Sequence, residues 1–116
     1  MGVNVDDYTI LRSQPMSTLT KLQNWFQQQC DGEWEHRYGL TLRSTDNPGW
    51  WVTIDLRGTA LEQQTFVPIM RGDFANGNPQ PPWLHCYVKD TVFHAGCDAD
   101  HLDEIIGIFL AWTRIE

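Results

Sequence analysis

The alternation of apolar and polar residues divides the chain into a helix, a series of strands and a second helix. In residues 18–30, apolar side chains recur at the three-and-four spacing of an amphipathic helix. Ser17 or Thr18 is a suitable cap at its start, and Gly32 lies where its carboxyl-terminal end is expected. The pattern therefore predicts a first helix over residues 18–30.

The middle of the chain has the two-residue period of β-strands. A first antiparallel hairpin is predicted around the Asp46-Asn47-Pro48-Gly49 turn, and a second around Lys89-Asp90. A further strand is expected between the hairpins, and Pro68 places it at an edge or near a strand end. The predicted strands span residues 35–44, 50–57, 63–70, 83–89 and 91–97.

A final helix is predicted over residues 100–114. Asp100 is a suitable cap, and Asp103 and Glu104 lie in its positive first turn. Its apolar residues cover more than one narrow stripe. The helix is therefore either sandwiched between the sheet and the amino-terminal arm or partly used in a homodimer contact.

These elements indicate an α+β fold with an antiparallel sheet of four to six strands. The amino-terminal and carboxyl-terminal helices are expected on one face of this sheet. The other face then carries Trp51, Thr53 and Asp55. Residues 1–16 are expected to form an arm, and residues 17–116 a single α+β domain.

Charge narrows the classes of partner. The formal net charge is −7, which disfavours binding to a nucleic-acid backbone or to an anionic membrane. The chain has no apolar run of about 18 residues and no basic segment followed by an apolar one at its start, so we expect a cytoplasmic protein. An acidic surface instead favours capture of a basic protein.

The cysteines give no sign of a reactive thiol. Acidic residues follow Cys30 and Cys97, which would disfavour a thiolate. Cys86 is next to His85, but neighbours on a strand point to opposite faces. Three reduced, partly buried thiols are expected, and no catalytic residue, cofactor or metal is predicted.

Two other groupings have both a chemical and a structural interpretation. His94, Cys97 and His101 have a spacing that a zinc ion could use, but a polar turn before the last helix explains them equally. Glu33 and Glu35 would share one face of a strand, as in a hydrolytic carboxylate pair, or form a solvated strand entrance. The structural interpretation is preferred for both groups.

The six tryptophans are more informative. Trp25 and Trp112 lie on the apolar sides of the two helices, and Trp50 is in phase with the buried side of its strand. Trp51 is out of phase with that side. It therefore packs under the amino-terminal arm or forms an anchor in a protein interface, where tryptophan is enriched.

Several segments of the chain are distinctive. The most specific are Gly-Glu-Trp-Glu-His at residues 32–36 and Asp-Asn-Pro-Gly-Trp at residues 46–50, followed by Phe93-x-Ala95-Gly96 and the apolar pattern from Leu102 to Trp112. Through these segments the sequence resembles the immunity protein 53 family over about residues 19 to 113.

This resemblance implies a bacterial protein of polymorphic toxin systems that binds and neutralises a cognate toxin domain, as a monomer or a homodimer. The toxin would have a basic surface if it is a nuclease. A small thiol-dependent enzyme using Cys97 or Cys86 is the alternative, and some relatives look to be labelled sulfurtransferases. The candidate contacts with the partner are Glu33, Glu35, Trp51, Asp55 and Asp73.

Overall fold

The computed structural model describes residues 16–114. The predicted amino-terminal arm lies, apart from Met16, outside these residues. Helix α2 spans Thr18–Gln29, and the Ser17 hydroxyl accepts a hydrogen bond from the main-chain N–H of Thr20 at 3.1 Å. This cap satisfies one of the free amides of the first turn. The first predicted helix is therefore confirmed.

The segment after α2 differs from the prediction. Residues 34–37 form the short helix α3 (Trp34–Arg37), and strand β1 spans Leu40–Thr45. The Asp31 carboxylate accepts the N–H groups of Glu33 and Trp34 at 2.9 Å, and the Glu35 carboxylate accepts those of Asp31 and Gly32. These bonds fold the segment into a helical turn. The expectation that Glu33 and Glu35 share one face of a strand was therefore wrong.

Five antiparallel strands form one sheet in the order β1-β2-β5-β4-β3. Both predicted hairpins are present, β1–β2 and β4–β5. The turn of the second hairpin is formed by Asp90 and Thr91, both with positive φ, which matches the twist of the two strands. The remaining strands are β2 (Gly49–Asp55), β3 (Ile69–Arg71), β4 (Leu84–Lys89) and β5 (Val92–Asp98).

Strand β3 is much shorter than the predicted strand over residues 63–70. Pro68 has no N–H to donate, and it immediately precedes the strand. The residues before it bind the end of the last helix instead. Trp112 Nε1 donates to the Thr65 carbonyl at 3.0 Å, and Gln64 Nε2 donates to the Trp112 carbonyl at 3.1 Å.

Helix α4 (Leu102–Thr113) begins two residues later than predicted, and its cap position is His101 rather than Asp100. The buried carboxylate of Asp98, 1% exposed, determines this geometry. It accepts the N–H groups of Trp83 and Asp100 at 2.8 Å and lies 2.6 Å from His101 Nδ1. Burial raises the pKa of Asp98, but these hydrogen bonds and the histidine hold it below its ordinary value.

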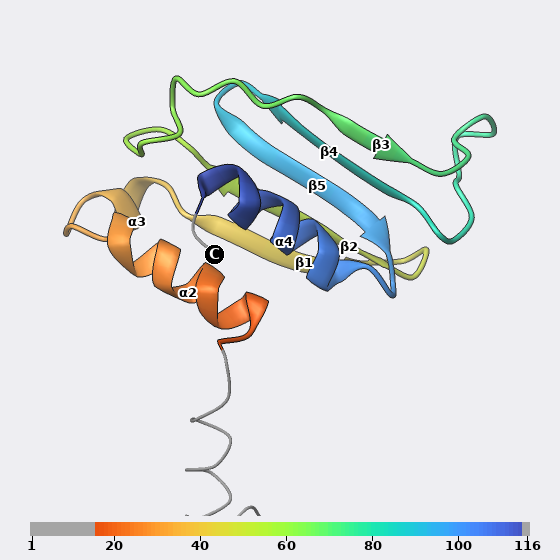
Figure 1. Ribbon diagram of the computed structural model, residues 1–116, viewed down its shortest axis with the longest axis horizontal. Coiled ribbons are helices and arrows are strands. Elements are labelled where there is room, and N and C mark those ends of the chain that lie inside the picture. Colours follow the sequence, from red (N-terminus) through yellow and green to blue (C-terminus); the bar gives the residue numbers. More distant parts are fainter. Residues whose placement is uncertain (1–15, 115–116) are drawn as a thin grey trace, which may run out of the picture.

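Helices α2 and α4 cover the same face of the sheet, as predicted (Figure 1). The core lies between them and the central strands. Phe93 of β5 and Phe109 of α4 are completely buried, with ring centroids 5.1 Å apart. Trp25 of α2 contacts Phe109 edge to face at 4.9 Å. The last helix is therefore part of the core.

The two edges of the sheet differ in length. At one edge, β3 has three residues; at the other, β1 has six. An apolar groove lies beside β1, between that strand and α2. It is lined by Leu19, Leu22, Gln23, Phe26, Leu40 and Leu42. Within residues 16–114, no helix is long and apolar enough to cross a lipid bilayer.

Candidate functional site

The face of the sheet opposite the helices, called here the open face, carries every second residue of its strands. The register places Trp51 opposite Gly96, which lies opposite His85 on the next strand. In the neighbouring row, His94 is opposite Tyr87. Trp51, His85, Tyr87 and His94 are only half-buried, and no helix of residues 16–114 covers them. Among the described residues nothing covers the open face, and the predicted packing of the arm over Trp51 lies outside them.

Aromatic rings form a continuous series across this face. The ring of His94 stacks on Tyr87, with centroids 4.9 Å apart and planes 12° from parallel, and it contacts Trp51 at 6.0 Å. His85 also contacts Tyr87, with ring centroids 4.7 Å apart. The series continues with Phe74, in the loop before β4, and with Trp83, which directly precedes β4. Phe74 contacts both His85 and Trp83. We call this series the aromatic band: Trp51, Phe74, Trp83, His85, Tyr87 and His94.

Gly96 allows Trp51 to lie flat on the sheet. A Cβ atom at Gly96 would be 2.7 Å from two ring carbons of Trp51 and 3.5 Å from a ring carbon of Trp83. Aromatic rings that cover a glycine in a strand restore part of the packing that the missing side chain would supply. The position of both tryptophans therefore depends on a glycine in the centre of the sheet.

The histidines of the aromatic band are uncharged at neutral pH. Burial lowers the pKa of His85 and of His94 below the ordinary value, because it disfavours the protonated ring. Both groups therefore act at pH 7 as neutral aromatic rings with a polar edge. Rings of this kind suit a contact surface that mixes apolar area with hydrogen bonding.

Asp55 ends strand β2 at one corner of the open face. Both its oxygens bind the Arg57 guanidinium, at 3.0 and 2.6 Å. Burial raises the pKa of Asp55, but the hydrogen bonds and charge of Arg57 hold it below its ordinary value. The guanidinium also lies 4.8 Å from the centroid of the Tyr38 ring. This carboxylate is therefore already partnered within the chain.

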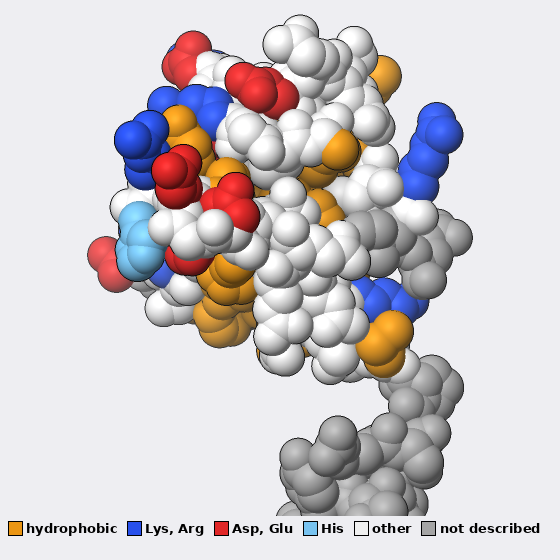
Figure 2. Space-filling model, turned by 90° about the vertical axis from the view of Figure 1, so that its left-hand side faces the viewer, with side chains coloured by type: hydrophobic (Ala, Val, Ile, Leu, Met, Phe, Trp, Pro, Cys, Tyr) orange, Lys and Arg blue, Asp and Glu red, His pale blue; other side chains and the backbone are white. Residues whose placement is uncertain are grey.

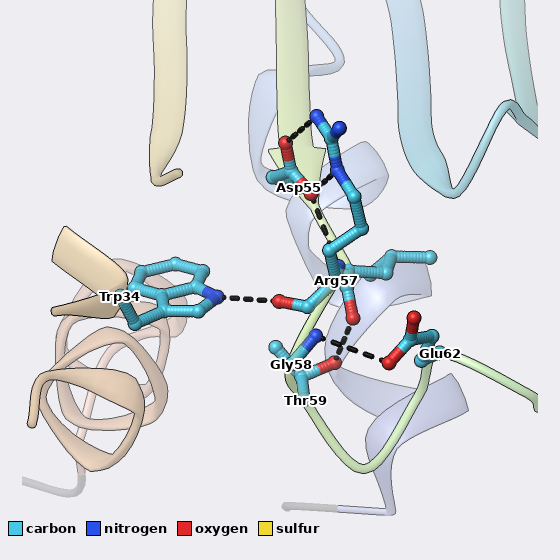
Figure 3. A network of polar contacts seen from close by, with 7 residues as sticks. Trp34, Asp55, Arg57, Gly58, Thr59 and Glu62 are labelled. Atoms are coloured by element: carbon cyan, nitrogen blue, oxygen red, sulfur yellow. Dashed lines mark hydrogen bonds and ion pairs between the residues drawn. The ribbon is translucent and has the colours of Figure 1, made fainter. Parts of the chain in front are cut away.

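The main chain next to this ion pair is fixed by a second set of contacts (Figure 3). The Trp34 indole donates to the Arg57 carbonyl at 2.8 Å, and the Gly58 N–H donates to Glu62 at 3.2 Å. Trp34 is 5% exposed and packs against Trp25 of α2. The corner of the open face is thus tied to the core through α3.

The structure brings together two of the five predicted contact residues. Trp51 and Asp55 both lie on the open face. Glu35 caps the turn before α3, and Glu33 precedes that helix. Asp73 lies in the loop after β3, where its carboxylate accepts the Ala75 N–H at 2.9 Å. Glu33 and Glu35 therefore lie outside the strands of the open face, whereas Asp73 immediately precedes Phe74 of the aromatic band.

The rest of the aromatic band was not predicted from the sequence. Alternation within residues 83–89 places Trp83, His85 and Tyr87 on one side of β4. The sequence therefore contained the signal that groups these three residues. It contained no signal that places them beside Trp51, because that proximity depends on β5 lying between β2 and β4.

The geometry of the cysteines opposes a thiol mechanism. Cys86 and Cys97 are fully buried on the helix-covered face. Burial raises the pKa of Cys86 to about 12 and that of Cys97 to about 11. Burial, Glu35 and Asp31 also raise the pKa of Cys30. Because the thiolate is the nucleophile, none of these thiols is activated at neutral pH.

The side chains of His94, Cys97 and His101, whose sequence spacing a zinc ion could use, do not come together in the structure either. His94 lies on the open face, whereas Cys97 points toward the helices. His101 is bound to Asp98, which raises the pKa of its imidazole through their hydrogen bond. No group of three or more candidate metal ligands occurs in the described part of the chain.

Gly96→Ala is expected to lower the free energy of unfolding by about 1–3 kcal/mol, because the new methyl group would overlap the Trp51 ring. Gly107→Ala is the matched control. A Cβ there has no neighbour within 4 Å, and the change should stabilise α4 by about 0.5–1 kcal/mol. Urea unfolding measures both. An undiminished stability of Gly96→Ala would contradict the packing of Trp51.

A disulfide reagent such as dithionitrobenzoate at pH 8 should label only Cys30 rapidly, since Cys86 and Cys97 are buried. Absorbance in native buffer and in denaturant measures the accessible and total thiols. The variant Cys30→Ser should lose the rapid phase completely. A rapid phase that persists in this variant would show that a core thiol is exposed and reactive.

The comparisons with known proteins give one match. The sequence profile of the family described as immunity protein 53 matches residues 19–114, which cover α2 to the end of α4. No curated protein and no solved structure matches the chain. Because the match spans most of the sequence and every described helix and strand, the chain belongs to the immunity protein 53 family.

Proposed function

We propose that this protein neutralises a cognate toxin domain by binding it through the open face of the sheet. The observation that carries the proposal is the aromatic band, left uncovered by the helices. Tryptophan and tyrosine are enriched among the residues that dominate binding energy in protein interfaces. Neutralisation then requires only that the chain occupies the toxin's active site or blocks its substrate path.

Two features make this face suitable as a contact surface. Its rings pack against one another and against Gly96, so little side-chain freedom is lost when a partner binds. The face is also built on strands β2, β5 and β4, which are anchored in the core. A rigid surface of aromatic residues reduces the entropy cost of association.

The proposal assigns different roles to the predicted contacts. Trp51 would be a central anchor, and Asp55 would hold Arg57 at the rim. Glu33 and Glu35 would touch only a toxin that extends beyond the end of the sheet, and Asp73, next to Phe74, would lie at the border of the interface. The protein would act in the cytoplasm of the bacterium that produces it, before the toxin reaches its target.

Co-expression tests the function directly. The toxin domain encoded by the gene beside this one should arrest growth when expressed alone, and expression of this chain should restore it. An unrelated acidic protein of similar size serves as the control for charge. If growth stays arrested although the chain is soluble and abundant, the chain is not the immunity protein of that toxin.

Substitutions on the open face test the surface. Trp51→Ala and Tyr87→Ala should each weaken toxin binding by about 2 kcal/mol or more, which is roughly 30-fold in Kd. Leu19→Ala is the matched control, since Leu19 is 60% exposed but lies on α2. Calorimetric titration gives the affinities, and thermal unfolding confirms that each variant is folded. Unchanged affinity in both open-face variants would place the interface elsewhere.

A further inference from the structure

Several cations border the open face, although the chain as a whole is acidic. The formal net charge is −7, yet four of the eight lysines and arginines border this face. Arg43 lies directly opposite Trp51, and Lys89 follows Tyr87 by two residues on β4. Arg37 lines a shallow hollow together with Asp55, which holds the fourth cation, Arg57.

The carboxylates carried by the strands of this face are already engaged. Asp55 and Asp98 are the only two at open-face positions of the described strands. Asp55 is bound by Arg57, and Asp98 is buried and bound by His101. The other carboxylates of the described residues lie in helices, turns and loops, and one of them, Asp90, follows Lys89 and is close enough for its charge to act on His94.

The cations have no comparable internal partners. Arg37, Arg43 and Lys89 form no ion pair within residues 16–114. Figure 2 views the end of the molecule that holds α3. On the left of this view, Lys and Arg side chains lie among hydrophobic and acidic side chains, and further Lys and Arg side chains lie at the right-hand edge. A partner that supplies carboxylates would complement these free charges and be guided to the face by them.

We infer that the open face docks onto an acidic, partly apolar protein surface, with partner carboxylates opposite Arg43 and Lys89 and an apolar centre against Trp51 and Tyr87. This inference rests on the proposed function and names the chemistry of the toxin surface that is bound. It departs from the expectation of a basic toxin surface, which the overall charge alone would suggest. A toxin with a basic substrate groove would then be held through a different part of its surface.

Aromatic rings with nearby cations also occur on sheets that bind single-stranded nucleic acids. The net charge of −7 weighs more against that alternative than against an acidic protein surface, because a nucleic-acid strand carries a negative charge at every phosphate. The two histidines add no positive charge at neutral pH, since burial lowers the pKa of both. Family membership likewise favours a protein partner.

The test measures association of the chain with a catalytically inactive form of the toxin domain identified by co-expression. Stopped-flow fluorescence gives the association rate at 50 and 500 mM NaCl. The double variant Arg43→Glu with Lys89→Glu should associate about tenfold more slowly at low salt, and the difference should shrink at high salt. The matched control, Lys21→Glu with Arg114→Glu, carries the same charge change away from the open face. It should stay within about twofold of the parent.

Each contrary result has a distinct meaning. Faster association of the open-face variant would show that the bound toxin surface is basic, and equal slowing of both double variants would show an effect of net charge alone. Either result overturns the inference but leaves neutralisation, and hence the proposed function, intact. Tight binding of a fluorescent 20-nucleotide single strand, lost in the open-face variant, would assign the face to nucleic acid. Absence of any toxin binding would overturn the inference and the proposed function together.

Discussion

Helices α2 and α4 bury their apolar sides against the same face of one sheet, and most other features of the molecule follow from that arrangement. Phe93 and Phe109 meet in the centre of the resulting core. Because side chains alternate along a strand, covering one face leaves every second residue of β2, β5 and β4 on the other. A core built on one side only therefore decides which residues a partner can reach.

The uncovered face departs from the usual polar exterior of an antiparallel sheet. Trp51 and Tyr87 retain exposed apolar area, which in a soluble protein usually indicates an interaction surface. Gly96 moderates this exposure, because it lets the Trp51 ring lie flat and bury one side. The glycine weakens the strand locally, and its presence in a central strand is better explained by the surface it supports than by the stability of the sheet.

The sequence predicted the elements whose signals are local and regular. The two long helices and both hairpins follow from the 3.6-residue and two-residue periods. Helix α3 was not predicted because it depends on hydrogen bonds from nearby main-chain amides to the side chains of Asp31 and Glu35. Strand β3 was predicted too long because Pro68 and the contacts with the end of α4 keep the preceding residues out of the sheet. Alternation in β2 was enough to place Trp51 outside the core. Its grouping with Tyr87 required the strand order, which no local pattern encodes.

The unequal edges of the sheet have a consequence for handling the protein. Unpaired edge strands are templates for aggregation, and short edges close to proline are poor ones. Strand β3 has only three residues after Pro68, whereas β1 offers six residues and a neighbouring apolar groove. Concentrated samples should therefore begin to self-associate at β1, and a charged residue in place of Leu42, which is 37% exposed, is a suitable change for keeping them soluble.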